Sequence, residues 1–274
     1  MNKFLTLVHE YRGTHVLKGS AILFFLYFWL TKALSFLQHR TRFLNNLVHS
    51  LVQHLPHSEF QIRNTTGIFL VRPFDDSTTI CSDYFEAHLR SWLQRPPQKD
   101  LLLDIGANRG LYTVLALNSY GYREVHAFEP NSDVFNTLKK NIGLNGLQDR
   151  VGAHSFGLGD SISTMGFTVD EMHKGGGRVA QRDTDASFTV SIKPLDTVLS
   201  KTLASRTNFV KIDTEGYEFA VLAGATQTLA LMPLGSCIMV ESAEPARIAQ
   251  ILAPYGFEKD ASVAFDHLFI KSAL

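Results

Sequence analysis

The stretch LLLDIGANRGLYT, residues 101–113, decides the fold of this chain. It opens with an apolar run that reads as a short buried strand containing Asp104 near its end. Gly106 and Gly110 then flank a turn into a helix predicted to begin near Arg109. Glycine is needed where the backbone turns tightly or a ligand approaches it closely. The free amides at the start of the helix would face that ligand. The stretch therefore predicts a ligand-binding crossover in a parallel sheet.

The residue types of this turn favour a ligand with a positively charged end. A turn that holds the pyrophosphate of a nicotinamide cofactor usually reads GxGxxG. Here Asn108 replaces the second glycine, and Asp104 would place a negative charge beside the pyrophosphate. A carboxylate suits the ammonium and sulfonium groups of S-adenosylmethionine (SAM). A dehydrogenase or nucleotide-sugar enzyme of the same fold class is the less favoured alternative.

Two later strand ends carry further acidic residues. The strand VHAFE, 125–129, ends in Glu129, from which a carboxylate could accept hydrogen bonds from both ribose hydroxyls. The alternative for Glu129 is a solvent-facing residue that caps the next helix. Asp160, in GLGDS at 157–161, could reach the adenine amino group, although these residues also form ordinary turns. The predicted cofactor site comprises Asp104, Gly106, Asn108, Gly110, Glu129 and Asp160.

Strands and helices alternate from residue 101 onward, which predicts a mostly parallel sheet with helices on both faces. Strands are expected over 101–105, 124–129, 151–158, 164–169, 188–192, 209–213, 237–241, 257–259 and 268–271. Helices are expected over 111–117, 132–144, 219–231 and 246–252. Before this region, residues 60–72 predict a β-hairpin and residues 84–92 a helix.

The N-terminal segment, residues 1–55, predicts apolar and amphipathic helix. Its apolar run ILFFLYFWL, 22–30, lies in an uncharged stretch of only 13 residues, 19–31, whereas a membrane span needs about 20. Three alternatives stand: a helix lying on a membrane surface through residues 16–38, a transmembrane anchor, or a helix buried against protein. The expected organisation is thus 1–55, a hairpin-and-helix region at 56–98, and a catalytic domain at 99–274.

Composition restricts the partners. Lys plus Arg and Asp plus Glu both number 26, so net charge gives no general attraction to nucleic acid. Two cysteines, Cys81 and Cys237, make no disulfide framework and fit a reducing compartment. We therefore expect a cytoplasmic protein, free or attached to the cytoplasmic face of a membrane. Oligomeric state is left open.

Four motifs resemble those of the FkbM-type methyltransferases: DIGANRGLYT (104–113), AFEPN (127–131), PLDTVL (194–199) and KIDTEGYEFAVLAGA (211–225). The similarity runs from about Phe60 to the C-terminus. The resemblance implies a class I methyltransferase fold, Rossmann-like with seven strands, and SAM as cofactor. Characterised members of the family look like O-methyltransferases that often act on sugar or polyketide hydroxyls, but the family is broad and the acceptor does not carry over. With the possible membrane helix, the resemblance leads us to expect O-methylation of a hydroxyl on a sugar, glycan or related natural product. The apolar N-terminus is not part of this resemblance.

Residues at the end of the strand expected over 209–213 should line the acceptor pocket, because methyl transfer needs the acceptor aligned with the sulfonium. Asp213 and Glu215 are the candidates for orienting the acceptor or accepting its proton, with helix capping as the alternative. Lys211 is expected to be their buried partner, and His173 is a weaker candidate base. No metal site is predicted. The alternatives to sugar O-methylation are a non-catalytic membrane-associated scaffold, or methylation of a lipid or protein.

Overall fold

The computed structural model describes residues 14–18, 59–72, 77–169, 177–180 and 186–273. The chain divides into two compact units, with the boundary between Phe85 and Glu86. This boundary lies before residue 99, where the sequence places the start of the catalytic domain. The residues between include a 3-10 helix, Arg90–Gln94, in the second unit.

The first unit contains a three-stranded antiparallel sheet, ordered β1–β2–β3. The strands β2 (Phe60–Arg63) and β3 (Ile68–Val71) form the predicted hairpin, and β1 (His15–Lys18) pairs with β2. A short helix, α4 (Ser77–Ile80), follows. Asn64 fixes the hairpin turn, since its Oδ1 accepts the amides of Thr66 and Gly67.

Only residues 14–18 of the N-terminal segment are described, and 15–18 of these form strand rather than helix. The rest of this segment, 1–13 and 19–55, lies outside the described residues, so the helix predicted there stays a prediction. Within the described part of the chain, no helix is long and apolar enough to cross a membrane.

The second unit is built on a seven-stranded sheet in the order β13–β14–β12–β11–β4–β5–β6. The five strands from β12 to β6 are parallel, and β14 and β13 add antiparallel pairs at one edge. Chain order reverses beside β4, which creates the switch point where ligands of such sheets bind. The strands are β4 (Leu101–Ile105), β5 (Glu124–Phe128), β6 (Val151–His154), β11 (Thr207–Ile212), β12 (Cys237–Glu241), β13 (Phe257–Val263) and β14 (Asp266–Lys271).

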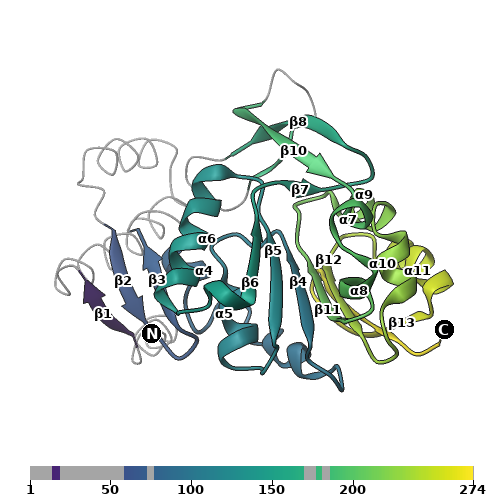
Figure 1. The fold of residues 1–274 in the computed structure, drawn as a ribbon, viewed down its shortest axis with the longest axis horizontal. Helices are drawn as coiled ribbons and strands as arrows, with labels where there is room; N and C mark the ends of the chain where they lie inside the picture. Colours follow the sequence, from purple (N-terminus) through teal and green to yellow (C-terminus); the bar gives the residue numbers. More distant parts are fainter. Residues whose placement is uncertain (1–13, 19–58, 73–76, 170–176, 181–185, 274) are drawn as a thin grey trace, which may run out of the picture. The chain divides into compact units, whose positions relative to one another are not determined.

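Helices cover both faces of this sheet. Figure 1 shows α5 (Leu111–Asn118) and α6 (Ser132–Leu144) toward one side, and α9 (Glu218–Ala223), α10 (Thr226–Leu231) and α11 (Pro245–Leu252) toward the other. Alternate strand residues such as Leu103 and Ile212 pack in one core with Val221 and Ile248 of the second group. The intervening residues, Asp104 and Lys211, therefore face α5. This architecture confirms the predicted class I methyltransferase fold.

A smaller sheet, ordered β7–β10–β8–β9, lies at one end of the large sheet in Figure 1. Its strands are β7 (Gly157–Leu158), β8 (Ser163–Thr168), β9 (Arg178–Val179) and β10 (Phe188–Lys193). The predicted pair at 164–169 and 188–192 is confirmed as an antiparallel ladder. Tyr217, beyond β11, packs on this sheet and donates a hydrogen bond to Sδ of Met165, 3.0 Å away.

Three predicted elements differ from the structure. The single strand expected over 151–158 is two, because β6 pairs in the large sheet and β7 in the small one. The helix expected over 219–231 breaks into α9 and α10. At the break Gly224 lies so close to Gly159 that a Cβ atom would overlap the Gly159 carbonyl. The helix expected over 84–92 was wrong: these residues form turns that lead into the 3-10 helix Arg90–Gln94.

Candidate active site

The glycine turn after β4 lies where β4, β5 and β11 end. Gly106 and Gly110 have φ values of +75° and +86°, and Asn108 has φ of +51°. A Cβ atom at Gly106 would overlap the backbone oxygen of Asp213. The amide of Gly106 donates to the Phe128 carbonyl at 3.0 Å. Gly110 is the N-cap of α5, so the helix begins at Leu111, as predicted. The turn thus has a defined backbone shape that only glycine at 106 permits.

Asp104 lies beneath this turn with a side chain that is fully buried. Its Oδ2 accepts a hydrogen bond from the Thr113 hydroxyl at 2.6 Å. Its Oδ1 has no hydrogen-bond partner among the described residues and lies 3.9 Å from Nζ of Lys211. Burial raises the pKa of the Asp104 carboxyl, and the positive charge of Lys211 opposes that shift. A buried carboxylate oxygen without a donor is costly, so this oxygen is suited to receive one.

Glu129 links the two sequence motifs of the cofactor site. It is buried, and its Oε2 accepts the amide of Asn108 at 3.0 Å. Its Oε1 accepts the amide of Asn131 at 2.9 Å. Burial raises the Glu129 pKa to about 7, although both amides favour the ionised form. The cap of α6 is Asn131, whose side chain accepts the Asp133 and Val134 amides. Glu129 is therefore neither solvent-facing nor the helix cap.

Asp160 differs from the two buried carboxylates because it is exposed to solvent. Its Oδ1 accepts a hydrogen bond from the Ser161 hydroxyl at 2.9 Å. The residue before it, Gly159, lies against Tyr217. Contact of Asp160 with adenine stays a prediction.

Asp213 follows β11 and forms an ion pair with Lys211, as the sequence suggests. Nζ of Lys211 lies 3.1 Å from Oδ2 of Asp213 and also donates to the Gly106 carbonyl at 3.1 Å. Lys211 is buried; burial alone would lower its pKa, but Asp213, Asp104 and Glu86 raise it overall. The ammonium group therefore ties the glycine turn to the strand end that carries Asp213.

Among the described residues, no side chain of the N-cap residue caps α9, so Asp213 is not its cap; Glu218, the first residue of this helix, instead holds the loop that precedes it. Oε1 of Glu218 accepts the Thr214 hydroxyl at 3.1 Å and the Gly216 amide at 2.8 Å. Glu215 is exposed at φ of +52°, and partial burial of its carboxyl, with Asp213 close by, raises its pKa. Asp213 is thus available at the strand ends, and a role for Glu215 stays a prediction.

Three acidic residues join Asp213 that the sequence did not single out as site residues: Glu86, Glu241 and Asp266. Glu241 ends β12 and Asp266 pairs with it across the antiparallel ladder. Glu86, at φ of +50°, accepts the Tyr112 hydroxyl at 2.7 Å. Only Glu241, at a strand end, had a sequence signal that could have marked it. We call Glu86, Asp213, Glu241 and Asp266 the carboxylate cluster.

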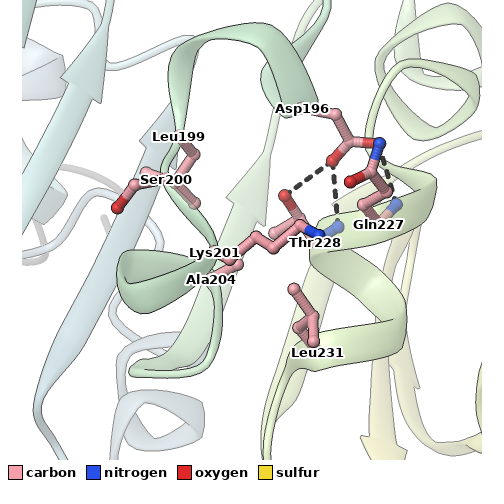
Figure 2. Close-up of a pocket in the computed structure, with 8 residues that line it drawn as sticks. All are labelled: Asp196, Leu199, Ser200, Lys201, Ala204, Gln227, Thr228 and Leu231. Atoms are coloured by element: carbon pink, nitrogen blue, oxygen red, sulfur yellow. Dashed lines mark hydrogen bonds between the residues drawn. The ribbon is translucent and has the colours of Figure 1, made fainter.

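The PLDTVL motif, 194–199, has a structural role, and its carboxylate does not belong to the carboxylate cluster. A pocket of about 220 Å³ lies between α7 (Leu195–Val198), α8 (Lys201–Ala204) and α10, and Asp196 is one of the residues that line it (Figure 2). The Asp196 carboxylate accepts the amides of Gln227 and Thr228 at 2.8 and 2.9 Å. It also accepts the hydroxyls of Thr226 and Thr228. Asp196 therefore caps α10, and its oxygens are used within the fold.

Two histidines in the described part of the large sheet, His126 and His154, contact each other. His126 lies in β5, with Nδ1 3.1 Å from Nε2 of His154 and Nε2 3.1 Å from Glu124. Burial lowers the pKa of His154 to about 4. His173 lies outside the described residues. Within the described residues, no group of three or more His, Cys, Asp or Glu side chains could hold a metal ion.

Three curated proteins match parts of this chain. The chain is 28% identical over 141 residues to "Hexuronic acid methyltransferase AglP" of Haloferax volcanii, covering 52% of this chain and 56% of that protein. It is 26% identical over 196 residues to "Methyltransferase sdnD" of Sordaria araneosa, covering 59% and 75%. A match to "Methyltransferase 1" of Beauveria bassiana covers 59% of that protein, so the chain spans under two thirds of two of these relatives.

Solved structures also align with the chain, at low identity and with TM-scores below 0.5. The FkbM methyltransferase of Methylobacillus flagellatus KT aligns with a TM-score of 0.44 and 16% identity, covering 63% of this chain and 43% of that one. M. jannaschii TYW2, solved in complex with AdoMet, aligns with a TM-score of 0.44 and 12% identity, covering 80% and 89%. The model of the methyltransferase FkbM domain matches residues 104–258, which is more than half of the chain. The chain, with its glycine turn and strand-end carboxylates inside that range, therefore belongs to the FkbM family of methyltransferases.

Proposed function

We propose that the chain transfers a methyl group from SAM to a hydroxyl group of a sugar or glycan. The observation that carries this proposal is the pair of buried carboxylates, Asp104 and Glu129, on either side of the glycine turn. Both are placed where ligands bind in parallel sheets, outside the carboxyl ends of the strands at the switch point. The proposal combines this cofactor pocket with the carboxylate cluster, in which Asp213 is the residue expected to meet the acceptor.

The residues of the pocket fit SAM. Oδ1 of Asp104 has no donor within the described residues, which suits a ligand with a positively charged hydrogen-bonding group. The oxygens of Glu129 each accept one backbone amide and have further acceptor capacity for ribose hydroxyls. The absence of a side chain at Gly106 lets the backbone of Asp213 approach the glycine turn closely, which brings the end of β11 against the pocket. Asp160 is proposed for the adenine end.

When bound, SAM supplies an activated methyl group, and the protein must align the acceptor and take up its proton. Asp213 is held in one orientation by Lys211, so its second oxygen can orient an acceptor hydroxyl. The hydroxyl proton then passes to a carboxylate at the strand ends or to water. Glu215 is the second candidate for this step, because partial burial raises its pKa.

A sugar acceptor is supported by two observations. One relative of the chain is named for methylation of a hexuronic acid. In addition, the cluster that continues from Asp213 consists of carboxyl groups, which accept hydrogen bonds from hydroxyls. A flat apolar acceptor would leave these groups without donors, at a cost in binding free energy.

The test is calorimetric binding of SAM and S-adenosylhomocysteine (SAH), with Glu129→Ala and Gly106→Val as pocket variants and exposed Glu258→Ala as the control. We expect micromolar binding that both pocket variants weaken by about tenfold or more. Methyl transfer from labelled SAM is then assayed on glycosides, lipids and peptides. Folded wild-type protein that binds neither cofactor would refute the pocket. Binding with transfer only to lipid or peptide would refute the sugar acceptor.

A further inference from the structure

The hairpin between β13 and β14 carries an exposed aromatic residue at the ligand-binding edge of the large sheet. Phe265 is 61% exposed and lies in the two-residue turn 264–265, which the pair of Val263 and Asp266 closes. Since β14 runs antiparallel to β12 and Asp266 lies opposite Glu241, this turn lies beside the carboxyl end of β12. The carboxyl ends of the parallel strands form the edge at which such sheets bind their ligands.

The turn is close to Asp213, the residue expected to meet the acceptor. Asp213 follows β11, which pairs with β12, and β12 in turn pairs with β14. Neighbouring strands lie about 4.8 Å apart, so the backbones of β11 and β14 are separated by roughly 10 Å. A sugar ring and the side chain of Phe265 together cover that distance. One acceptor can therefore contact both residues.

Three hydrogen bonds hold this turn against the end of β12. The amide of Ser242 donates to the Phe265 carbonyl at 2.8 Å. His267 is buried, and its Nε2 donates to the Ser242 carbonyl at 3.0 Å. Its Nδ1 lies 2.9 Å from the hydroxyl oxygen of Ser262. Phe265 is thus presented on a fixed backbone, which lowers the entropy that is lost when a ligand contacts it.

The residues of this turn depart from the usual chemistry of a hairpin. Two-residue hairpin turns favour glycine, asparagine or aspartate where φ is positive. Here Ala264 has φ of +54°, and the exposed Phe265 follows it. The turn at the opposite end of β12 keeps the rule, since Leu234, which is 50% exposed, precedes Gly235 at φ of +78°. Departures of this kind are expected at functional sites, where another requirement determines the residue.

Resting on the proposed sugar methylation, we propose that Phe265 is the acceptor-stacking residue: its ring contacts the C–H face of the sugar that is methylated. The face of an aromatic ring is the negative side of its quadrupole. The C–H groups on one face of a pyranose are weakly positive, so the two faces attract each other. The hydroxyls at the edge of the stacked sugar remain free to meet Asp213. Phe265 therefore contributes to acceptor binding and takes no part in cofactor binding.

The first test measures methyl transfer from labelled SAM to methyl β-glucoside, methyl β-galactoside and methyl β-glucuronide. The variants are Phe265→Ala, Phe265→Leu and Phe265→Tyr, with Leu234→Ala as the matched control at the other end of β12. We expect Phe265→Ala to raise the KM of the methylated glycoside by about tenfold, and Phe265→Leu by nearly as much. Phe265→Tyr keeps the ring face, so its KM should stay within about twofold of wild type. Neither kcat nor the Kd of SAM should change by more than about threefold.

An unchanged KM in Phe265→Ala, or an equal rise in Leu234→Ala, would overturn the proposal. A normal KM in Phe265→Leu would refute ring stacking, since leucine restores apolar contact without an aromatic face. Loss of SAM binding in Phe265→Ala would also count against the proposal, because it would connect Phe265 to the cofactor pocket. Circular dichroism spectra verify that each variant is folded.

A second test does not depend on methyl transfer. Phe265→Trp places a fluorescent ring in the turn, and Leu234→Trp is its control. Titration with the same three glycosides, with and without SAH, should change the emission of Phe265→Trp and leave that of Leu234→Trp unchanged. A change without methyl transfer would support the stacking residue and refute transfer to these glycosides. No change with any of the three would overturn the stacking residue, even where SAM binds to the pocket.

Discussion

Replacement of Lys211 by methionine tests the buried charge arrangement most directly. Methionine keeps most of the side-chain volume but removes the ammonium from between Asp104 and Asp213. It also removes the hydrogen bond to the Gly106 carbonyl. Loss of one partner of a buried ion pair costs about 3–5 kcal/mol. Because Asp104 is fully buried, we expect a loss in this range, equivalent to a fall in Tm of about 6–20 °C.

Urea unfolding followed by circular dichroism measures this loss, with exposed Lys259→Met as the control. Burial raises the pKa of Asp104 above its unfolded value, so the folded chain binds more protons and stability falls as pH rises. Without Lys211 that pKa rises further, so the deficit should shrink when the pH is lowered from 7.5 to about 5. Adding Asp104→Asn to the variant should recover part of the loss. A loss below about 1 kcal/mol that is independent of pH would refute the reasoning.

Three more predictions follow from contacts in the second unit. Because burial raises the pKa of Glu129 to about 7, its ionisation destabilises the fold as pH rises from about 4.5 to 7. Glu129→Gln should make the free energy of unfolding less dependent on pH by roughly 1–3 kcal/mol between pH 5 and 8, measured in urea; an unchanged slope would contradict this. Asp196→Ala should cost about 1–2 kcal/mol through loss of the α10 cap, and Asp196→Asn should recover part of it. Equal stability of Asp196→Ala and wild type would contradict that role. Gly224→Ala should lower Tm by several degrees because its Cβ would overlap the Gly159 carbonyl, whereas Gly146→Ala, with open space around it, should show only the cost of its positive φ.

The cofactor side of the site was predictable from sequence because its parts are local. The apolar run of β4 and the two glycines lie within residues 101–110, and Glu129 and Asp213 each directly follow a strand, β5 and β11. Parallel strands bring their carboxyl ends to one edge of the sheet. Asp104 and Glu129 are both buried there, and Asp213 is paired with Lys211 as expected. Local pattern therefore determined the position of these residues.

The acceptor side was less predictable because it depends on long-range contacts. Glu86 lies in a stretch that the sequence assigned to a helix before the core, and Asp266 reaches the site only through antiparallel pairing with Glu241. The break between α9 and α10 depends on Gly224 meeting Gly159, which lies 65 residues earlier. No local periodicity reports such pairings, so pattern analysis missed them.

The cap that Asp196 provides changes what the PLDTVL motif can be used for. Its carboxylate is engaged by four donors at the start of α10, none of which belongs to the glycine turn or the carboxylate cluster. A chain that had lost methyl transfer would still need the Asp196 cap to stabilise the start of α10. A sequence search that relies on PLDTVL would therefore retrieve inactive relatives together with active ones, and Asp104 and Glu129 are the positions that would separate them.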